Sequence, residues 1–279
     1  MRFVELLLVA TTVTGSIWVI DKLFFKPRRL MNVLWDRAST TSGPQDPWWV
    51  DYAKSFFPVL LIVLLLRSFV GEPFRIPSGS MNPTLIEGDF IFVNKYAYGL
   101  RLPFWGTRLL PVGQPKRGDI VVFKHDTKQE DMDVIKRVIA LPGDHIQYRD
   151  QKIILNGAPL QTVFEQELSQ VPDPVRGGTQ TLRQFREDLS GVQHAIFLRE
   201  QGLDALGQHY PYEDLVVPPN SYFVMGDNRD NSKDSRMWGL LKEEDLQGRA
   251  VAIWMSVESA RYWWWPRWPR WERLTLHLQ

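Results

Sequence analysis

The sequence has no cysteine among its 279 residues. This absence excludes disulfide scaffolds, thiol catalysis and thiolate metal sites, although it leaves the cellular compartment open. The sequence also has no surplus of one charge, because 33 Lys and Arg residues stand against 32 Asp and Glu residues. Nucleic-acid-binding proteins usually carry a basic surplus on one domain, so we expect no nucleic-acid partner.

Histidine is scarce and is never clustered. The five residues occur singly, without the H-E-x-x-H spacing of a zinc protease, and we interpret them as surface or structural residues. We expect neither a metal site nor a cofactor. Internal repeats and low-complexity tracts are absent too. The histidines are His125, His145, His194, His209 and His277.

Long apolar runs are confined to the N-terminal part of the chain, where there are two of them. Phe3–Ile20 contains a single charged residue, Glu5, and Phe56–Val70 contains only Arg67. A membrane-spanning helix needs about 20 mostly apolar residues, and each run reaches that length when its interfacial ends are included. Both runs therefore predict helices that span a membrane.

The polar segment between these runs is rich in basic residues, and the positive-inside rule places it in the cytoplasm. We predict transmembrane helices over residues 1–21 and 56–70, a cytoplasmic loop over 22–55 and an extracytoplasmic domain over 71–279. Two alternatives are a cleaved signal peptide over 1–20 and a single anchor with a buried first helix. The basic cluster directly after the first run argues against the signal peptide. Its members are Lys22, Lys26, Arg28, Arg29 and Arg37.

Beyond residue 85 the pattern changes to short β-branched and aromatic runs that are separated by turn residues. No long amphipathic helix intervenes, which favours an antiparallel β fold over a doubly wound sheet. Asn156-Gly157 is a strong hairpin signal. We predict a mainly β fold whose core comprises residues 71–159 and 218–258. The predicted strands are residues 89–93, 119–123, 133–139, 146–148, 152–155, 222–225 and 250–254.

Two segments differ from this core. Residues 160–217 are rich in Gln, Glu, Arg and Pro, have weaker periodicity and contain a Gly177-Gly178 turn, so we interpret them as an inserted subdomain. Residues 259–279 are rich in tryptophan that alternates with Pro and Arg. This tail could contact the headgroup region of a bilayer, which tryptophan favours, or could pack on the surface of its own domain.

A serine and a lysine are the candidates for catalysis. Ser80 lies ten residues beyond Val70, in the stretch PSGSMNPTL, and a serine hydroxyl needs a neighbouring base to become a nucleophile. Lys136 lies among apolar residues, and strand alternation puts it on the same face as Val134 and Val138, which favours its burial. Burial lowers the pKa of a lysine, and enzymes tune such bases to roughly 7–8. The alternative is an edge-strand lysine that points to solvent.

Residues 226–239, with the sequence GDNRDNSKDSRMWG, form the third segment of interest. The segment is dense in side chains that hydrogen-bond locally, which is typical of a rigid irregular loop. A calcium loop is the alternative, but counting from Asp230 places Ser235 at the sixth position, where an EF-hand requires glycine. We interpret the segment as a polar loop that orients the lysine amine.

Three motifs, PSGSMNPTL, DVIKRVIALPGD and GDNRDNSKDSRMWG, follow two apolar segments in this order. The arrangement resembles the bacterial type I signal peptidases (leader peptidases), which are serine proteases with a Ser/Lys dyad. The resemblance covers the N-terminal topology and the β core but not residues 160–217. It implies an antiparallel β catalytic domain of signal-peptidase type, with an inserted subdomain, preceded by two transmembrane helices. It further implies an endopeptidase that removes signal peptides from exported preproteins after small residues at −1 and −3.

The resemblance also assigns roles to single residues. Ser80 would be the nucleophile and Lys136 the general base, and Ser232 would orient the lysine amine. The Ser78 hydroxyl and the Ser80 backbone N–H would form an oxyanion hole, a device worth about 2.7–4 kcal/mol per donor. A supporting ion pair behind Ser232 would comprise Asp234 and Arg236.

Apolar side chains would border the shallow pockets for the small residues before the cleavage point. Position 134 departs from relatives, which often have an aromatic residue there. The pocket residues would be Phe74, Ile76, Met81, Val134 and Ile135.

The resemblance places the protein in the bacterial inner (cytoplasmic) membrane as a multi-pass protein whose catalytic domain faces the periplasm. Its partners would be exported preproteins and the lipid bilayer, and it would act near the secretion translocon. One alternative is another Ser/Lys hydrolase, such as a self-cleaving SOS repressor, but two spans and no DNA-binding segment argue against it. Another is a non-catalytic, membrane-tethered β domain that uses the tryptophan-rich tail.

Overall fold

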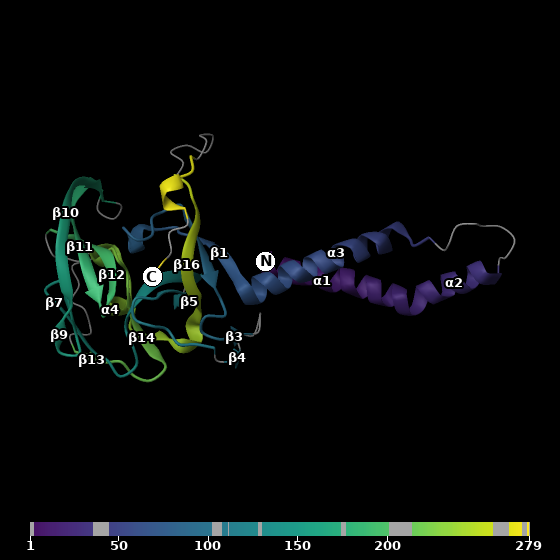
Figure 1. Cartoon of the computed structure of the whole chain (residues 1–279), viewed down its shortest axis with the longest axis horizontal. Helices are drawn as coiled ribbons and strands as arrows, with labels where there is room; N and C mark the ends of the chain where they lie inside the picture. Colours follow the sequence, from purple (N-terminus) through teal and green to yellow (C-terminus); the bar gives the residue numbers. More distant parts are fainter. Residues whose placement is uncertain are drawn as a thin grey trace. The chain divides into compact units, whose positions relative to one another are not determined.

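The structure is a computed structural model that describes residues 3–35, 45–101, 108–110, 112–127, 130–173, 177–200, 214–258, 268–274 and 278. The chain divides into two compact units, residues 1–70 and residues 71–279 (Figure 1).

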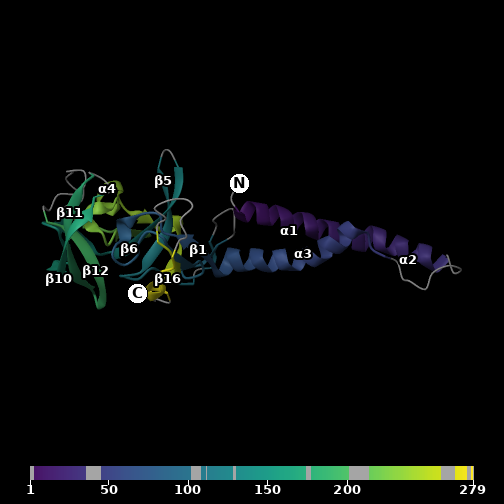
Figure 2. The ribbon, with the colours of Figure 1, turned by 90° about the horizontal axis from the view of Figure 1, so that it is seen from above.

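The first unit is a pair of helices that lie side by side (Figures 1 and 2). Helix α1, Phe3–Ile20, continues through a π-helical turn, Asp21–Phe25, into α2, Lys26–Trp35. Helix α3, Trp48–Leu65, ends in a second π-helical turn, Leu66–Val70. Both helices are long and apolar enough to span a membrane, over the stretches Glu5–Met31 and Trp48–Ser68.

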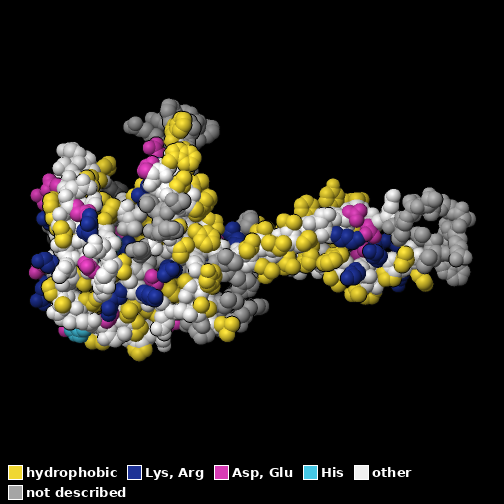
Figure 3. Space-filling model, viewed as in Figure 1, with side chains coloured by type: hydrophobic (Ala, Val, Ile, Leu, Met, Phe, Trp, Pro, Cys, Tyr) yellow, Lys and Arg dark blue, Asp and Glu magenta, His cyan; other side chains and the backbone are white. Residues whose placement is uncertain are grey.

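Helical structure extends well into the segment that the sequence predicted as a loop. The reason lies in the pairing of its charges: Arg29 contacts the buried carboxylate of Asp21 at 2.8 Å and that of Asp46 at 2.9 Å. Lys54 also pairs with Asp46. Because these charged side chains pair with one another, the polar residues beyond the apolar runs can also be helical. Figure 3 shows hydrophobic side chains along α1 and α3 and charged side chains gathered toward α2.

The second unit is built on a seven-stranded sheet in which every pair of neighbours is antiparallel. This confirms the predicted antiparallel β fold, and each of the seven predicted strands is present in the unit. In spatial order the sheet comprises β1 (Gly71–Arg75), β2 (Asp89–Asn94), β16 (Leu246–Ser256), β5 (Ile120–Thr127), β6 (Glu130–Ala140), β14 (Ser221–Met225) and β15 (Leu241–Lys242).

Two smaller sheets accompany it. The hairpin predicted at Asn156-Gly157 is confirmed, because both residues have positive φ, 53° and 83°, and join β8 to β9. The four-stranded sheet comprises β13 (Leu215–Val216), β7 (His145–Arg149), β8 (Lys152–Leu155) and β9 (Ala158–Pro159), and the two-stranded one β3 (Leu100–Arg101) and β4 (Arg108–Leu110).

The inserted segment is more regular than its sequence indicated. It forms an antiparallel sheet of three long strands, β10 (Gln161–Pro172), β11 (Thr179–Leu189) and β12 (Val192–Arg199). Gly177 and Gly178 precede β11 with φ of 74° and 77°, which confirms the predicted turn. Strand β10 is exposed along most of its length, so polar residues occupy both of its faces and hide the strand period.

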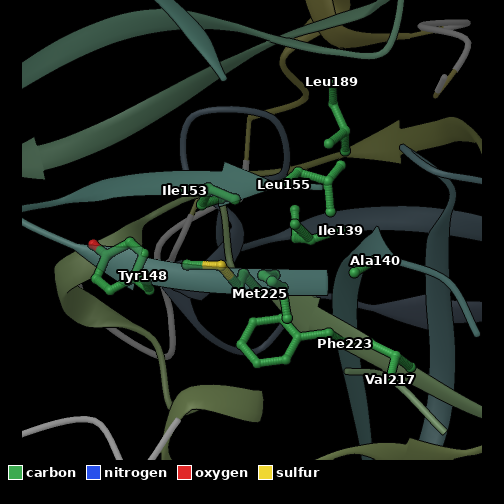
Figure 4. Packing of buried hydrophobic residues seen from close by; sticks show 10 residues of the cluster. Ile139, Ala140, Tyr148, Ile153, Leu155, Leu189, Val217, Phe223 and Met225 are labelled. Atoms are coloured by element: carbon green, nitrogen blue, oxygen red, sulfur yellow. The ribbon is translucent and has the colours of Figure 1, made fainter. Parts of the chain in front are cut away.

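Successive residues of β5 enter different hydrophobic clusters, as strand alternation requires. Ile120 and Val122 join one cluster, whereas Val121 and Phe123 join another with Val138 of β6. A third cluster packs the four-stranded sheet against β6 and β14 (Figure 4). Its members are Ile139, Ala140, Ile146, Tyr148, Ile153, Leu155, Leu189, Val217, Phe223 and Met225.

Part of the tryptophan-rich tail is described, and this part packs on its own domain. Arg273 donates to the buried carboxylate of Asp89 at 3.0 Å, and Arg270 donates to the Ser256 hydroxyl at 2.8 Å. These bonds fasten the tail to its own domain. The ring of Trp271 is nevertheless 70% exposed.

Replacing Phe223 by alanine tests the assignment of the core. Its ring is 1% exposed, so we expect Phe223→Ala to lower the free energy of unfolding by about 3–5 kcal/mol through lost burial and a new cavity. The control is Phe164→Ala on β10, where the ring is 54% exposed and the cost should be about 1 kcal/mol or less. Urea denaturation followed by tryptophan fluorescence measures both values. Equal losses would contradict the assignment.

Candidate active site

Ser80 lies in a short 3₁₀ turn, Gly79–Met81, which follows β1. The turn is held by buried apolar side chains on both sides, because Ile76 before it and Met81 within it are both in the core. The Ile76 amide also donates to the Asp89 carbonyl at 2.8 Å. Ser80 itself is half-buried and Ser78 is exposed. The nucleophile candidate is therefore rigidly supported yet reachable.

Lys136 lies on β6 and is only 4% exposed, which confirms the predicted burial. Its Nζ atom lies 2.8 Å from Ser80 Oγ and donates to the Ile135 carbonyl at 2.9 Å. Desolvation lowers the pKa of Lys136 to about 8, although the negative charges of Asp234 and Asp227 act to raise it. Near physiological pH a larger fraction of this amine is therefore neutral than of an ordinary lysine amine.

The loop 226–239 clamps the backbone of the serine turn. The Asn228 amide donates to the Ser80 carbonyl at 3.1 Å, and its side-chain amide donates to the Gly79 carbonyl at 3.0 Å. At Gly226, a β-carbon would lie 2.4 Å from the Ser80 carbonyl oxygen. Only glycine at this position allows the loop 226–239 to approach the serine turn this closely.

Sequence reasoning missed the residues that join the three segments. Asp227 accepts from Arg137 Nε at 2.9 Å and Nη2 at 2.8 Å, and from the Thr84 hydroxyl at 2.5 Å. Arg137 directly follows Lys136 on β6, and Thr84 lies four residues after Ser80. One carboxylate of the loop 226–239 therefore holds both β6 and the segment that contains Ser80. The available signal was Arg137 in an apolar strand, since a buried arginine requires a carboxylate partner.

The ion pair predicted behind Ser232 is present. Arg236 Nε lies 2.8 Å from Asp234 Oδ1, and Asp234 also accepts from the Gly226 amide at 3.0 Å. Burial opposes ionisation of Asp234, but the adjacent guanidinium outweighs it and holds the pKa of the carboxyl below its usual value. Arg236 also lies over the ring of Tyr148, 4.9 Å from its centroid.

The carboxylates of the loop each engage a separate partner, which agrees with a structural loop rather than a calcium loop. Asp230 accepts from the Arg199 amide and from the side chain of Gln151, both at 2.8 Å. Asp227 and Asp234 are occupied by arginines, as described above. Arg137, Arg199 and Gln151 thus hold the loop from outside, and Arg236 braces it from within.

Ser232 is brought to the site, but the orienting bond is not formed in this structure. A β-carbon on Gly226 would lie 2.3 Å from Ser232 Oγ, so this hydroxyl faces the same narrow space as the Ser80 carbonyl. Within the described residues, Ser232 Oγ is buried and makes no hydrogen bond. Its role toward Lys136 remains a prediction.

The structure separates one of the five predicted pocket residues from the others. Ile76 and Met81 lie in one hydrophobic cluster, against which Phe74 and Ile135 pack. Val134 packs against a different cluster. The reason is strand alternation, since adjacent residues of β6 point to opposite faces. Val134 therefore does not share the apolar surface formed by the other four.

Comparison with known proteins decides the family. The sequence profile described as "Signal peptidase, peptidase S26" matches residues 49–255. The chain belongs to this family. Two relatives named "Signal peptidase I", from Pseudomonas fluorescens and Pseudomonas aeruginosa, are each 40% identical over 275 residues, which cover 92% of this chain and 93% of the relative. A crystal structure of a signal peptidase I from Enterococcus faecalis aligns with 50% of this chain and 99% of its own, at 25% identity and a TM-score of 0.29.

As a member of the signal peptidase family, the chain is a serine peptidase, which removes the non-catalytic scaffold from consideration. Its two apolar helices fit a membrane-anchored protein. A serine peptidase needs a nucleophile with a base beside it, and in the described part of the chain the Ser80 hydroxyl and the Lys136 amine lie 2.8 Å apart.

Gly226→Ala tests the close approach of the loop to the serine turn. The added methyl group meets the Ser80 carbonyl and Ser232 Oγ, so the turn must shift, and we expect kcat to fall by roughly a hundredfold. Gly157→Ala is the control, since its turn is strained by alanine at φ 83° but nothing lies near the new group. It should lower the melting temperature without changing kcat. Steady-state peptidase kinetics and thermal unfolding of both variants provide the measurement.

Proposed function

We propose that the protein removes N-terminal signal peptides from exported preproteins, cleaving after small residues at −1 and −3, through a Ser80 nucleophile and a Lys136 general base. The observation that carries the proposal is the 2.8 Å contact between Ser80 Oγ and a lysine amine that is buried and has a lowered pKa. Membership of the signal peptidase family supplies the substrate class.

In the proposed reaction the neutral Lys136 amine takes the proton of the Ser80 hydroxyl as Oγ attacks the scissile carbonyl carbon. The Ser78 hydroxyl and the Ser80 backbone N–H stabilise the oxyanion of the tetrahedral intermediate. Lys136 then gives its proton to the departing amine, which is the new N-terminus of the mature protein. Water, deprotonated by the same lysine, hydrolyses the acyl-enzyme. Ser232 helps to orient the amine, supported by the ion pair of Asp234 with Arg236.

The apolar surface beside Ser80 supports a preference for small residues. The side chains of Ile76 and Met81 are buried in the core, and those of Phe74 and Ile135 pack against it and are partly exposed. We expect this apolar surface to offer shallow pockets, which small side chains fit best. An extended substrate segment can bind here as an added strand, with main-chain hydrogen bonds giving affinity.

The proposed location is the bacterial inner membrane, with two spans and the catalytic domain in the periplasm, close to the secretion translocon. Support comes from the two apolar helices and from the basic residues between them, which the positive-inside rule places in the cytoplasm. The short distance in sequence from the second span to Ser80 suits a substrate whose apolar signal segment stays in the bilayer. The exposed ring of Trp271 is suited to the bilayer interface.

Alanine substitution of the two reacting groups tests the proposed dyad. We expect Ser80→Ala and Lys136→Ala each to lower kcat for a preprotein with an Ala-x-Ala site by roughly 10⁴-fold or more, because either change removes the dyad as a unit. Ser169→Ala and Lys152→Ala, on exposed strand positions, are the matched controls and should cleave normally. Gel analysis of processed preprotein gives the result. Undiminished cleavage by either dyad variant would refute the mechanism.

The pH dependence of cleavage tests the state of the base. Lys136 is active when neutral, so kcat/KM should rise as pH increases through the lowered pKa of about 8 and then level off. An ordinary lysine, with a pKa of about 10.4, would give a rate that still climbs steeply at pH 10. Initial rates of preprotein cleavage between pH 6 and pH 10 distinguish the two profiles, and a steep rise through pH 10 would contradict the desolvated base.

A further inference from the structure

The inserted sheet lies directly against the loop 226–239. The backbone of β12 meets this loop at Phe197, whose amide donates to the Asp227 carbonyl at 2.9 Å and which forms a parallel bridge with Asn228. Two residues further on, the Arg199 amide donates to Asp230 Oδ2 at 2.8 Å. The insertion thus forms part of the framework that holds the loop.

A buried ion pair reinforces this contact. Arg229 of the loop donates from Nη1 to Glu187 Oε1 of β11 at 2.9 Å, and its Nη2 contacts the other carboxylate oxygen. Both side chains are almost fully buried. Burial opposes ionisation of Glu187, yet the charge of Arg229 holds the pKa of its carboxyl at about 2. The carboxylate is therefore ionised throughout the working pH range.

The same carboxylate contacts a buried histidine. His194 Nε2 on β12 lies 3.3 Å from Glu187 Oε2 and 3.9 Å from Asp227 Oδ1. The sequence indicated only a surface or structural role for this histidine. Its position between the two carboxylates connects the inserted sheet to the same Asp227 that ties the three catalytic segments together.

Two short series of contacts connect Arg229 to Ser80 and to the polar groups near Lys136. The carbonyl of Arg229 accepts from Arg236 Nη2 at 2.5 Å, and Arg236 pairs with Asp234 beside Ser232. Its neighbour Asn228 holds the carbonyls of Gly79 and Ser80. If Arg229 is displaced, both the serine turn and the polar groups around Lys136 are therefore expected to move.

We propose that the inserted sheet is a positioning element for catalysis and that Glu187, acting through Arg229, is the positioning residue that sets the loop against the Ser80 turn. This inference rests on the proposed function, since it concerns the geometry of the same dyad. It gives the inserted segment a role in catalysis, in addition to its contribution to the fold.

The test uses the full chain in detergent and a preprotein with an Ala-x-Ala site. The wild type must cleave this preprotein and Ser80→Ala must not. Failure at that first step refutes the proposed function and is separate from the outcomes below.

Glu187→Gln keeps the shape of the side chain and removes its charge. We expect kcat to fall by roughly ten- to a hundredfold while KM changes by less than about twofold, because the substrate contacts remain and the reacting groups shift. Amide hydrogen exchange over residues 226–232 should become faster. Glu187→Asp keeps the charge, and its kcat should recover to within about threefold of the wild-type value.

Asp173→Asn is the matched control. Asp173 pairs with Arg199 Nη2 at 3.3 Å in the inserted sheet, and both side chains are buried. The variant also removes a buried carboxylate from an arginine, so it should lose thermal stability, but kcat and the exchange of residues 226–232 should not change. A comparison at equal loss of melting temperature separates positioning from stability.

Two results would overturn the proposal: wild-type kcat in folded Glu187→Gln, or an equal loss of kcat in Asp173→Asn. If Glu187→Gln does not fold, Arg229→Lys replaces it, because a lysine keeps the positive charge but cannot hold both carboxylate oxygens of Glu187 in the same way. A kcat that is lowered at unchanged KM in Arg229→Lys, but not in Asp173→Asn, supports the proposal. A kcat equal to that of the wild type in folded Arg229→Lys refutes it.

Discussion

The removal of the Lys136 amine from water is the constraint on which the whole site depends. A buried lysine is neutral more readily than an exposed one, and only the neutral amine can activate a serine. Nearby carboxylates would cancel this effect if they were free to stabilise the ammonium form. Asp227 and Asp234 are instead occupied by Arg137 and Arg236. The arginines therefore hold the loop in place and also limit the negative charge that the lysine experiences.

Three arginines that are almost fully buried, Arg137, Arg229 and Arg236, lie around the site, and each has a carboxylate partner. Buried ion pairs of this kind add little net stability, because the cost of desolvation offsets the attraction. Their geometry is demanding, however, since the planar guanidinium fits a carboxylate in few orientations. In this protein Arg137 with Asp227 and Arg229 with Glu187 join separate segments, whereas Arg236 with Asp234 braces the loop 226–239 internally. Their main effect is therefore to select one arrangement of the loops.

Much of the second unit was predictable from the sequence, because its strands alternate and its turns use glycine and asparagine. The prediction of the dyad rested on the apolar setting of Lys136, which the structure confirms. Other features depend on partners that are distant in sequence. The pairing of Arg137 with Asp227, the regularity of β10 and the separation of Val134 from Ile135 all follow from tertiary packing. The sequence did not predict the helical structure of residues 21–35, because charged residues are typical of loops when their pairing is unknown.

The hydrogen bonds of the site also have a consequence for folding. Ser80 and Lys136 are 56 residues apart, and the bond from Asn228 to Gly79 spans 149 residues. Contacts of such long range form slowly, since the entropy of closing a large loop opposes them. The site is complete only when the loop 226–239 contacts the serine turn, Gly79–Met81. A nascent chain that has emerged only as far as β12 therefore contains both members of the proposed dyad but lacks the loop that holds the serine turn.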